Sequence, residues 1–277
     1  MIKIVTDSSS DITKELAEEY NITIVPLFAR FGEEIFRERV DLSDEELYRR
    51  LIEGKVHPAT IQPNPKDFVD VYESVAKEST TVVSIHISAK LSGTLNSAFE
   101  ARGIVGSKMQ IELLDSLTTT AGLGLVVLRA ARVAKEGGTL QQVLDAARDA
   151  IANDYSLCLL DTLKYLEKGG RIGKAKALMG SLLNVKPIIS IKNGEVIPYV
   201  NSRNRAKGLD QLYEYVSKFK TIEDLAVVYG TTLDDAKAMT QRLSPLFKGQ
   251  VKVFRMGSTL AIHTGPGTII VTVIGKQ

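Results

Sequence analysis

Segments of strand-like composition alternate with segments of helical periodicity through the first half of the chain. Residues 2–6 and 81–87 are rich in Ile, Val and Thr, and residues 68–75 carry apolar side chains at helical spacing. Because the connections are long enough to reverse the chain, this alternation indicates a parallel sheet with helices on both faces. We therefore predict an α/β fold with a three-layer α/β/α parallel-sheet domain over residues 1–154.

Capping signals indicate where several helices begin. Ser43 with Glu46 and Thr139 with Gln142 have the spacing of capping boxes, and Asn64 precedes a proline that suits a first helical turn. The Ser/Asp cluster after the first strand is expected to cap the helix that follows it. We also expect strands over residues 22–31 and 110–114, a helix starting near residue 92, and a helix over residues 119–136.

The second half of the chain has a different pattern. Asn193-Gly194 separates two apolar runs, which is the strongest short-range signal for a β-hairpin. The sheet in this half is therefore at least partly antiparallel. Further helices are expected over residues 205–219 and 233–246, and further strands over 225–229 and near 251 and 269. We predict a second, α+β domain with a mixed sheet over residues 155–277, and a ligand between the two domains.

The composition is that of an ordinary globular protein. The 277 residues are 44% hydrophobic and 25% charged, and the net charge of +2 gives no electrostatic case for nucleic-acid binding. No apolar run approaches the ~20 residues that span a bilayer, and the first residues lack the pattern of a signal peptide. The single cysteine, Cys158, lies among leucines and is expected in a buried strand. We predict a cytoplasmic protein without stable membrane insertion.

The common signatures of nucleotide, dinucleotide and metal sites are incomplete in this sequence. Residues 169–175 resemble a phosphate loop, but the first glycine is one position too close to the Gly-Lys pair, and Ala175 replaces the hydroxyl that would hold magnesium. The glycines near residue 122 lack the third glycine of a dinucleotide fingerprint. The three histidines have none of the spacings typical of metal sites. We therefore expect neither a cofactor nor a metal.

Three segments, Thr6–Asp11, Thr60–Pro65 and Leu91–Ala98, place hydroxyls where a strand gives way to a turn, and a fourth places a histidine after an apolar run and before a turn. His263 precedes a Gly-Pro-Gly turn, Thr60 opens the segment Thr60–Pro65, and Ser92 precedes Gly93. Hydroxyls at a helix N-terminus can receive an anion, and an imidazole can donate to an oxyanion. Together with the cation of Arg203, these groups could form one anion site in a cleft between the domains.

Each of these residues also has a purely structural interpretation. Ser92 could be a helix cap, and Arg203 could form a surface ion pair. His263 could be a hydrogen-bonded buried histidine in a hairpin or loop. On local grounds, these interpretations are at least as well supported as a binding role, and for Arg203 the surface ion pair is favoured.

Two other functions remain open at this stage. Ser92 and His263 could meet an acid to form a serine-type hydrolase of lipid esters, although Leu91-Ser-Gly-Thr lacks the Gly-x-Ser-x-Gly nucleophile elbow. A sensor of another small carboxylate is the second alternative.

Several motifs occur together along the chain. They are Thr6–Asp11, Thr60–Pro65, Leu91–Ala98, Lys168–Ile172, Asn201–Arg203 and Met256–Gly267. In these motifs and in their order, the chain resembles the DegV family of bacterial lipid-binding proteins from residue 2 to about residue 274. The resemblance implies a two-domain fold with one long-chain fatty acid, such as palmitate, in a tunnel between the domains.

The resemblance also implies which residues hold the fatty acid carboxylate. By motif, the positions are Thr60, Ser92, Gly93, Arg203 and His263. The chain departs from the family pattern at Ile61, where serine is common, so that Ile61 can offer only its backbone N–H to the head group. It departs again at Ile262, where the family usually has threonine before the histidine.

The family role further implies a protein partner. A separate ATP-dependent fatty acid kinase would phosphorylate the bound carboxylate, giving acyl phosphate for phospholipid synthesis. The chain would then be a non-catalytic presenting subunit, and we expect a monomer. The motifs at residues 6–11 and 168–171 are candidates for the tunnel mouth or a docking surface, although helix capping and a glycine-rich turn explain them too. Leu178, Met179, Leu182 and Leu183 are candidate tunnel residues, although ordinary core packing is their commoner role.

Overall fold

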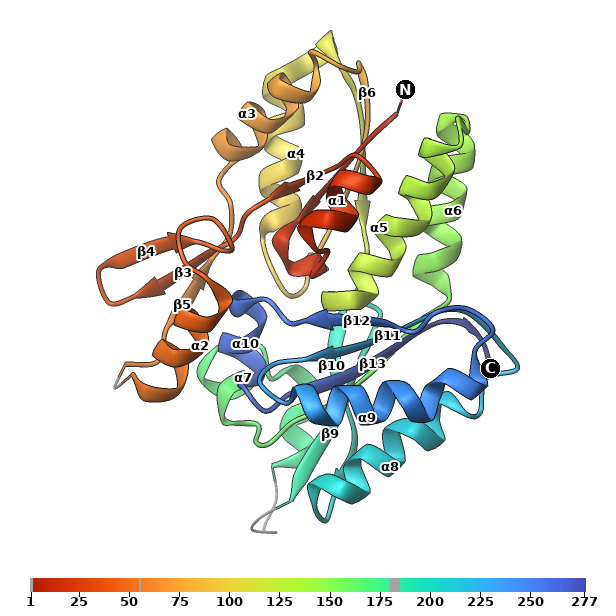
Figure 1. Cartoon of the computed structure of the whole chain (residues 1–277). Coiled ribbons are helices and arrows are strands. Elements are labelled where there is room, and N and C mark those ends of the chain that lie inside the picture. The colour runs from red at the N-terminus through yellow and green to blue at the C-terminus, as the bar shows by residue number, and fades with distance from the viewer. Residues whose placement is uncertain (1, 55, 180–184) are drawn as a thin grey trace.

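The computed structural model describes residues 2–54, 56–179 and 185–277. Its first sheet is four-stranded and wholly parallel, in the order β2-β1-β6-β7 (Figure 1). The strands are β1 Lys3–Asp7, β2 Ile22–Val25, β6 Thr81–His86 and β7 Gln110–Asp115. The predicted parallel sheet is therefore confirmed.

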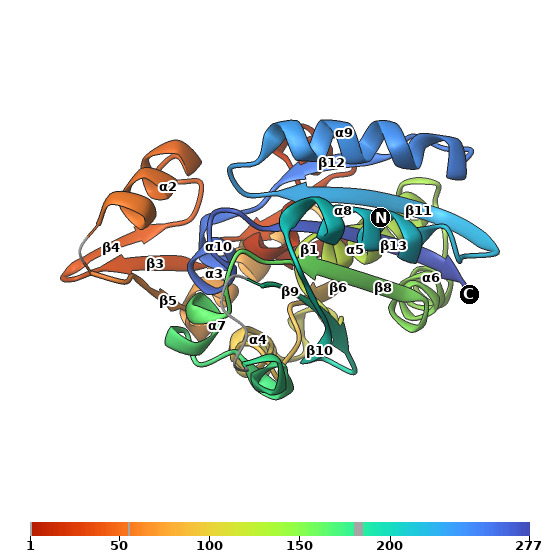
Figure 2. The same cartoon turned by 90° about the horizontal axis from the view of Figure 1, so that it is seen from below.

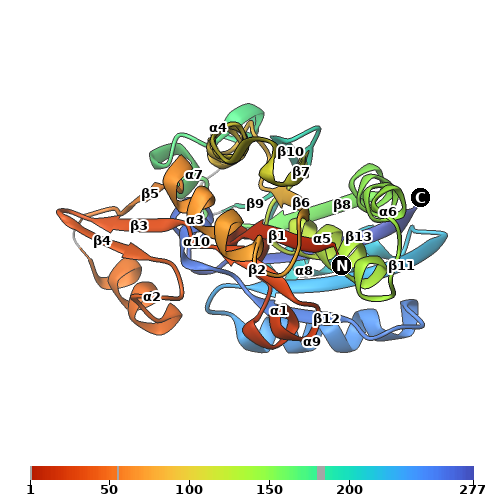
Figure 3. The same ribbon diagram turned by 90° about the horizontal axis from the view of Figure 1, so that it is seen from above.

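Helices cover both faces of this sheet (Figures 1 and 3). They are α1 Lys14–Glu19, α3 Pro65–Val75, α4 Thr94–Val105, α5 Thr120–Lys135 and α6 Leu140–Ala152. Along β1, Ile4 packs into the core that contains α5, whereas Val5 packs into the core formed with α3 and α4. The sheet is apolar on both sides because side chains alternate along each strand and both faces are covered.

The second sheet is mixed and has the order β10-β9-β8-β13-β11-β12. Its strands are β8 Asp154–Leu159, β9 Lys186–Lys192, β10 Glu195–Ser202, β11 Thr221–Tyr229, β12 Lys252–Arg255 and β13 Ile269–Lys276. Its pairs are antiparallel, except that β11 and β12 are parallel. Two helices, α8 Arg205–Val216 and α9 Leu233–Leu243, cover one face (Figure 2). The predicted mixed sheet is confirmed.

The hairpin predicted at Asn193-Gly194 joins β9 to β10. Asn193 and Gly194 have φ values of 51° and 80°, as a two-residue turn of the I′ type requires. Cys158 is buried in β8, as predicted.

One hydrophobic core joins the two large sheets. Helix α5 packs against β1 and β6 on one side and against β8, β11 and β13 on the other. Ile4 of the parallel sheet, Leu125 of α5 and Ile270 of the mixed sheet belong to the same buried cluster. The mixed sheet begins at Asp154, but the division into domains 1–154 and 155–277 remains a prediction, because the core is continuous across it.

A third, antiparallel sheet was missed by the sequence analysis. Strands β3 Phe28–Phe31, β4 Glu34–Arg37 and β5 Ala59–Ile61 pair in the order β4-β3-β5 and, with α2 Asp44–Glu53, project to one side of the molecule (Figures 1 and 3). The expectation of one strand over residues 22–31 is wrong. Pro26 has no N–H with which to continue the ladder, and the chain leaves the parallel sheet after β2.

Local capping signals were mostly reliable. Asn64 and Asp67 form a reciprocal capping box at α3, as Thr139 and Gln142 do at α6. At α1, however, the cap is Thr13, whose hydroxyl accepts a backbone N–H of the first turn. The expectation that the Ser/Asp cluster caps this helix is therefore wrong.

That cluster forms the short 3₁₀ helix η1 Ser8–Ser10, capped by Asp7. At α2, Ser43 accepts the backbone N–H of Glu46. The Glu46 carboxylate pairs with Arg49 and Arg50 instead of returning to the cap, so only half of that capping box forms.

The remaining elements are short. They are η2 Gly106–Lys108, α7 Lys164–Lys168, η3 Gly173–Leu178, η4 Ser244–Leu246 and α10 Ser258–Thr264. The alternative interpretation of the His263 segment as a hairpin or loop is wrong, because residues 258–264 form helix α10, which ends at Gly265, whose φ is 89°. In the described part of the chain, no helix is long and apolar enough to cross a membrane.

Candidate functional site

A pocket lies where the carboxyl-end loops of β1, β6 and β7 face the mixed sheet. It holds about 850 Å³ of space between atoms, counted to and including its open mouth. The parallel-sheet side contributes Ser9, Ile87, Leu91, Ser92, Thr119 and Thr120; the mixed sheet contributes Ser156, Cys158, Ile189, Ser190, Ile191, Val196 and Ile270; and Leu27, Thr60, Leu166, Arg171, Thr259, Leu260, His263 and Thr264 complete the lining. The lining is mostly apolar, with hydroxyls and two basic side chains.

His263 and Thr60 form a hydrogen-bonded pair in this pocket. His263 lies in the last turn of α10 and Thr60 in β5, and 2.9 Å separates His263 Nε2 from Thr60 Oγ1. Burial lowers the pKa of His263 from 6.5 to about 4, and the nearby Arg171 and His57 add to this effect. The imidazole is therefore neutral at physiological pH.

The other ring nitrogen of His263 lies against Gly169. Its Nδ1 is buried and has no hydrogen-bond partner among the residues that the structure describes. Gly169, between α7 and η3, packs against the ring, because a Cβ at that position would lie 2.1 Å from Nδ1. A larger residue there would displace the histidine, which explains one glycine of the Lys168–Arg171 motif.

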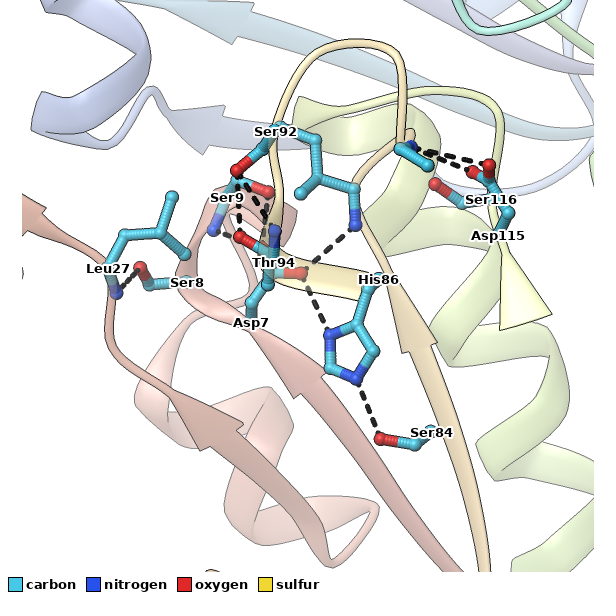
Figure 4. A network of polar contacts seen from close by, with 12 residues as sticks. Asp7, Ser8, Ser9, Leu27, Ser84, His86, Ser92, Thr94, Asp115 and Ser116 are labelled. Atoms are coloured by element: carbon cyan, nitrogen blue, oxygen red, sulfur yellow. Dashed lines mark hydrogen bonds and ion pairs between the residues drawn. The ribbon is translucent and has the colours of Figure 1, made fainter. Parts of the chain in front are cut away.

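Ser92 lines the same pocket, ahead of α4. Its Oγ lies 2.8 Å from Thr94 Oγ1 and 3.3 Å from the Thr94 backbone nitrogen, from which it accepts a bond (Figure 4). Gly93 is the N-cap residue and provides no side-chain cap. A Cβ on Gly93 would lie 2.2 Å from Gln62 Oε1, so glycine allows the segment after Thr60 to approach the start of α4.

Three predicted head-group residues do not line the pocket; they are Ile61, Gly93 and Arg203. Ile61 is part of β5, where it pairs with Phe28. Arg203 is exposed after β10. Their roles in binding therefore remain predictions.

Arg171 is the arginine that lines the pocket. Its Nε donates to the Leu91 carbonyl at 3.2 Å, and its Nη1 donates to the Gly169 carbonyl at 2.8 Å. These bonds hold the exposed guanidinium beside the loop that carries Ser92. The sequence analysis placed this residue in a candidate mouth motif but assigned the cation to Arg203.

A buried polar network behind the pocket was also missed (Figure 4). His86 Nδ1 lies 3.0 Å from Asp7 Oδ2, and His86 Nε2 lies 2.7 Å from Ser84 Oγ, which in turn contacts Tyr72 at 3.0 Å. Asp7 also accepts hydrogen bonds from Ser9, which lines the pocket. A possible signal was the position of Asp7 and His86 at the carboxyl ends of two strands that could be neighbours.

Among the described residues, neither His86 nor His263 forms a serine-protease-like triad with a serine that a substrate could reach. In the buried network, Ser84, His86 and Asp7 are connected in the order of a triad, with the histidine in the middle, but all three side chains are fully buried and Ser84 Oγ also contacts Tyr72, so this hydroxyl is closed to a substrate. At the pocket, His263 contacts Thr60 and Ser92 contacts Thr94. The geometry therefore gives the hydrolase alternative no support.

The resemblance of residues 169–175 to a phosphate loop is also superficial. The segment follows α7 and leads into η3, whereas a phosphate loop connects a strand to a helix. Lys174 forms an ion pair with Glu195 at 2.5 Å. Across the described ranges, no group of His, Cys, Asp and Glu side chains has the arrangement of a metal site.

Two carboxylates position α10, and therefore His263. Glu38 is 2% exposed and accepts hydrogen bonds from Ser258 Oγ at 3.0 Å and from the backbone N–H and hydroxyl of Thr259, both at 2.8 Å. Asp11 accepts the Gly257 N–H at 2.7 Å. Since Gly257 has no side chain with which to cap α10, Glu38 acts as the cap from a distant segment.

Asp11 is held in an apolar environment. Burial raises the pKa of its carboxyl to about 8, while Arg39 and the hydrogen bond from Gly257 oppose this rise. The connection between the loop after β1 and α10 therefore involves a carboxyl that takes up a proton near neutral pH.

Comparisons with known proteins agree with this architecture. The family model of DegV, described as a family of uncharacterised proteins, matches residues 1–276. A DegV domain-containing protein of Deinococcus radiodurans is 34% identical over 97% of this chain and 96% of its own length.

Solved structures of the family have the same fold. A DegV family protein from Thermus thermophilus, described by its fatty acid binding, superposes with a TM-score of 0.92 at 32% identity over 99% of both chains. A stearic acid-binding protein from Eubacterium ventriosum gives 0.91 at 29% identity, covering 100% of this chain and 99% of that one. The chain belongs to the DegV family.

Proposed function

We propose that this chain binds one long-chain fatty acid in the pocket between the two large sheets. The observation that carries the proposal is the His263–Thr60 pair, which lies with Ser92 and Arg171 in an otherwise mostly apolar pocket. The acyl tail would lie along the apolar lining, and the carboxylate would lie near these polar groups. The related proteins from Thermus thermophilus and Eubacterium ventriosum, both described as binding fatty acid, support this assignment.

The two parts of such a ligand contribute different amounts of free energy. Each buried methylene contributes about 0.8 kcal/mol, so a chain of ~16 carbons supplies most of the affinity. A hydrogen bond to a charged group contributes roughly 1.5 to 3 kcal/mol. The tail therefore keeps the ligand bound, and the polar groups fix the orientation of its carboxylate.

We further propose that the chain presents this carboxylate to a separate ATP-dependent kinase, which forms the acyl phosphate. Arg171 is exposed and Ser92 and His263 are partly exposed, so the head group could be reached from outside. In this role the chain has no catalytic activity of its own. We expect a monomer that binds its kinase transiently.

Extraction of the purified protein under denaturing conditions, followed by mass spectrometry, tests the proposal. We expect one long-chain fatty acid per chain, and binding of palmitate or oleate after the lipid is removed. A hydrolase would instead turn over an ester, and a sensor of a small carboxylate would bind acetate or a similar acid. No recovered fatty acid and no binding of added palmitate or oleate would overturn the proposal.

A further inference from the structure

The pocket has a second polar region, toward the end of β8 opposite the one near His263. The length of strand β8 sets the scale of the separation. Asp154 and Leu159, at its two ends, lie about 16 Å apart at about 3.3 Å per residue. Asp154 lies against α5, since a Cβ on Gly122 would be 3.1 Å from both carboxylate oxygens. Beyond the other end of β8, Asp161 contacts Gly267, which follows α10. The start of α5 and the end of α10 therefore lie toward opposite ends of β8.

The N-terminus of α5 faces the pocket. Thr119, its N-cap residue, and Thr120, its first residue, both line the pocket and are 7% and 5% exposed. The first N–H groups of a helix have no partner within it, and the Thr119 side chain makes no capping bond. This end of a 16-residue helix also carries partial positive charge.

The Thr119 hydroxyl differs from its neighbours in its hydrogen bonding. Its Oγ1 is buried and forms no hydrogen bond with any described residue. Two serine hydroxyls that also line the pocket are satisfied, since Ser156 Oγ lies 2.9 Å from Thr272 Oγ1 and Ser190 Oγ donates to the Ser156 carbonyl at 2.8 Å. Buried polar atoms normally have hydrogen-bond partners, so an atom of the ligand is the expected partner of the Thr119 hydroxyl.

We propose that Thr119, Thr120 and the first N–H groups of α5 form a subsite for a neutral oxygen atom on the acyl tail, such as a hydroxyl or keto oxygen. This α5 subsite offers hydrogen-bond donors, and a hydroxyl or keto oxygen can accept hydrogen bonds from them. Among the described residues that line the pocket, the basic side chains are Arg171 and His263, so this end offers no cation to a second anion. The proposal rests on the proposed function, because it takes the carboxylate to be held near His263.

The test compares stearic acid with a positional series of monohydroxystearic and oxostearic acids. Their affinities are measured by calorimetry on the lipid-free full-length protein. In the wild type, we expect a chain with oxygen at one position to bind at least as tightly as stearic acid. Thr119→Val should shift this preference toward stearic acid by roughly threefold to tenfold. Thr119→Ser should restore it, because it keeps the hydroxyl.

Ser10→Ala is the matched control. The Ser10 hydroxyl is also buried and has no partner in the described ranges, but Ser10 does not line the pocket, so its removal should leave the preference unchanged. The inference is overturned if stearic acid binds but every oxygenated chain binds more weakly, with Thr119→Val making no difference; the hydroxyl then holds only water. If Thr119→Val weakens stearic acid itself and His263→Ala does not, the carboxylate lies at the α5 end and the inference is again wrong. Failure of stearic acid to bind at all contradicts the proposed function instead.

Discussion

Two histidines of this protein, His86 and His263, have opposite surroundings. His86 is fully buried, and both of its ring nitrogens have partners, Asp7 and Ser84. His263 is partly exposed to the pocket; one nitrogen contacts Thr60, and the other has no partner in the described residues. A histidine whose hydrogen bonds are complete contributes to the fold, whereas the His263–Thr60 pair lines a pocket that a ligand can enter.

The largest expected effect is a loss of stability when the buried network of Asp7, His86 and Ser84 is broken. Asp7→Ala removes the acceptor for His86, for Ser9 and for the backbone N–H of Ile87. Leaving several buried donors unsatisfied should lower the free energy of unfolding by about 3 kcal/mol or more. Urea denaturation measures this loss. A change below about 1 kcal/mol would show that water replaces the carboxylate and that the network is not structural.

The next effect concerns the carboxylate that holds α10. Glu38→Ala should lower stability by about 2 kcal/mol, since it removes the cap of the helix and leaves buried donors unpaired. It should also weaken palmitate binding, because His263 would no longer be held against Thr60. The control is Glu45→Ala, which removes an exposed ion pair with Arg255 and should cost less than about 1 kcal/mol. Equal losses of stability in the two variants would argue against the capping role.

Substitutions of His263 or Thr60, the hydrogen-bonded pair in the pocket, should weaken ligand binding more than they lower stability. His263→Ala and Thr60→Val should each weaken palmitate binding by roughly tenfold, because a hydrogen bond to a carboxylate is lost. The alcohol of the same chain length should bind the variants and the wild type alike. If the alcohol binds the wild type as tightly as palmitate does, these residues do not hold a carboxylate.

Two arginine variants test which arginine lies near the head group: Arg203, which was assigned by motif, or Arg171, which lines the pocket. Arg171→Ala should weaken palmitate binding by about twofold to fivefold at low salt, because exposed charge pairs contribute less than about 1 kcal/mol. Arg203→Ala should have a smaller effect, since Arg203 does not line the pocket. The reverse order, measured by the same titration, would support the assignment of Arg203 to the head group.

The parts that the sequence predicted correctly depend on neighbouring residues. The capping box at Asn64 and the hairpin at Asn193-Gly194 are set by a few consecutive side chains, and the alternation of strands and helices has the same local origin. The small antiparallel sheet and the capping of α10 by Glu38 depend on contacts between distant segments.

The candidate site also has parts that local motifs predict and parts that depend on contacts between distant segments. Thr60, Ser92 and His263 stand in recognisable motifs, and the structure brings all three to one pocket. The choice between Arg171 and Arg203 requires the path of the chain around α7 and β10, which a motif does not contain. Leu178 lies in η3 and Met179 is exposed next to it, whereas Leu182 and Leu183 lie outside the described residues, so the predicted tunnel lining stays a prediction for them.

The smallest expected effect is that of pH on binding. The pKa of His263 is lowered to about 4, so the imidazole stays neutral between about pH 6 and 8, and palmitate affinity should change less than twofold over that range. The folded protein disfavours the charged imidazole, so the stability that His263 contributes is complete above its ordinary pKa of 6.5 and is lost as pH falls toward 4. The difference in unfolding free energy between the wild type and His263→Ala, followed from pH 7 to pH 4, isolates this contribution from that of His57. A binding transition near pH 6.5 that disappears in His263→Ala would show that His263 titrates at its ordinary pKa. Burial would then not keep its imidazole neutral.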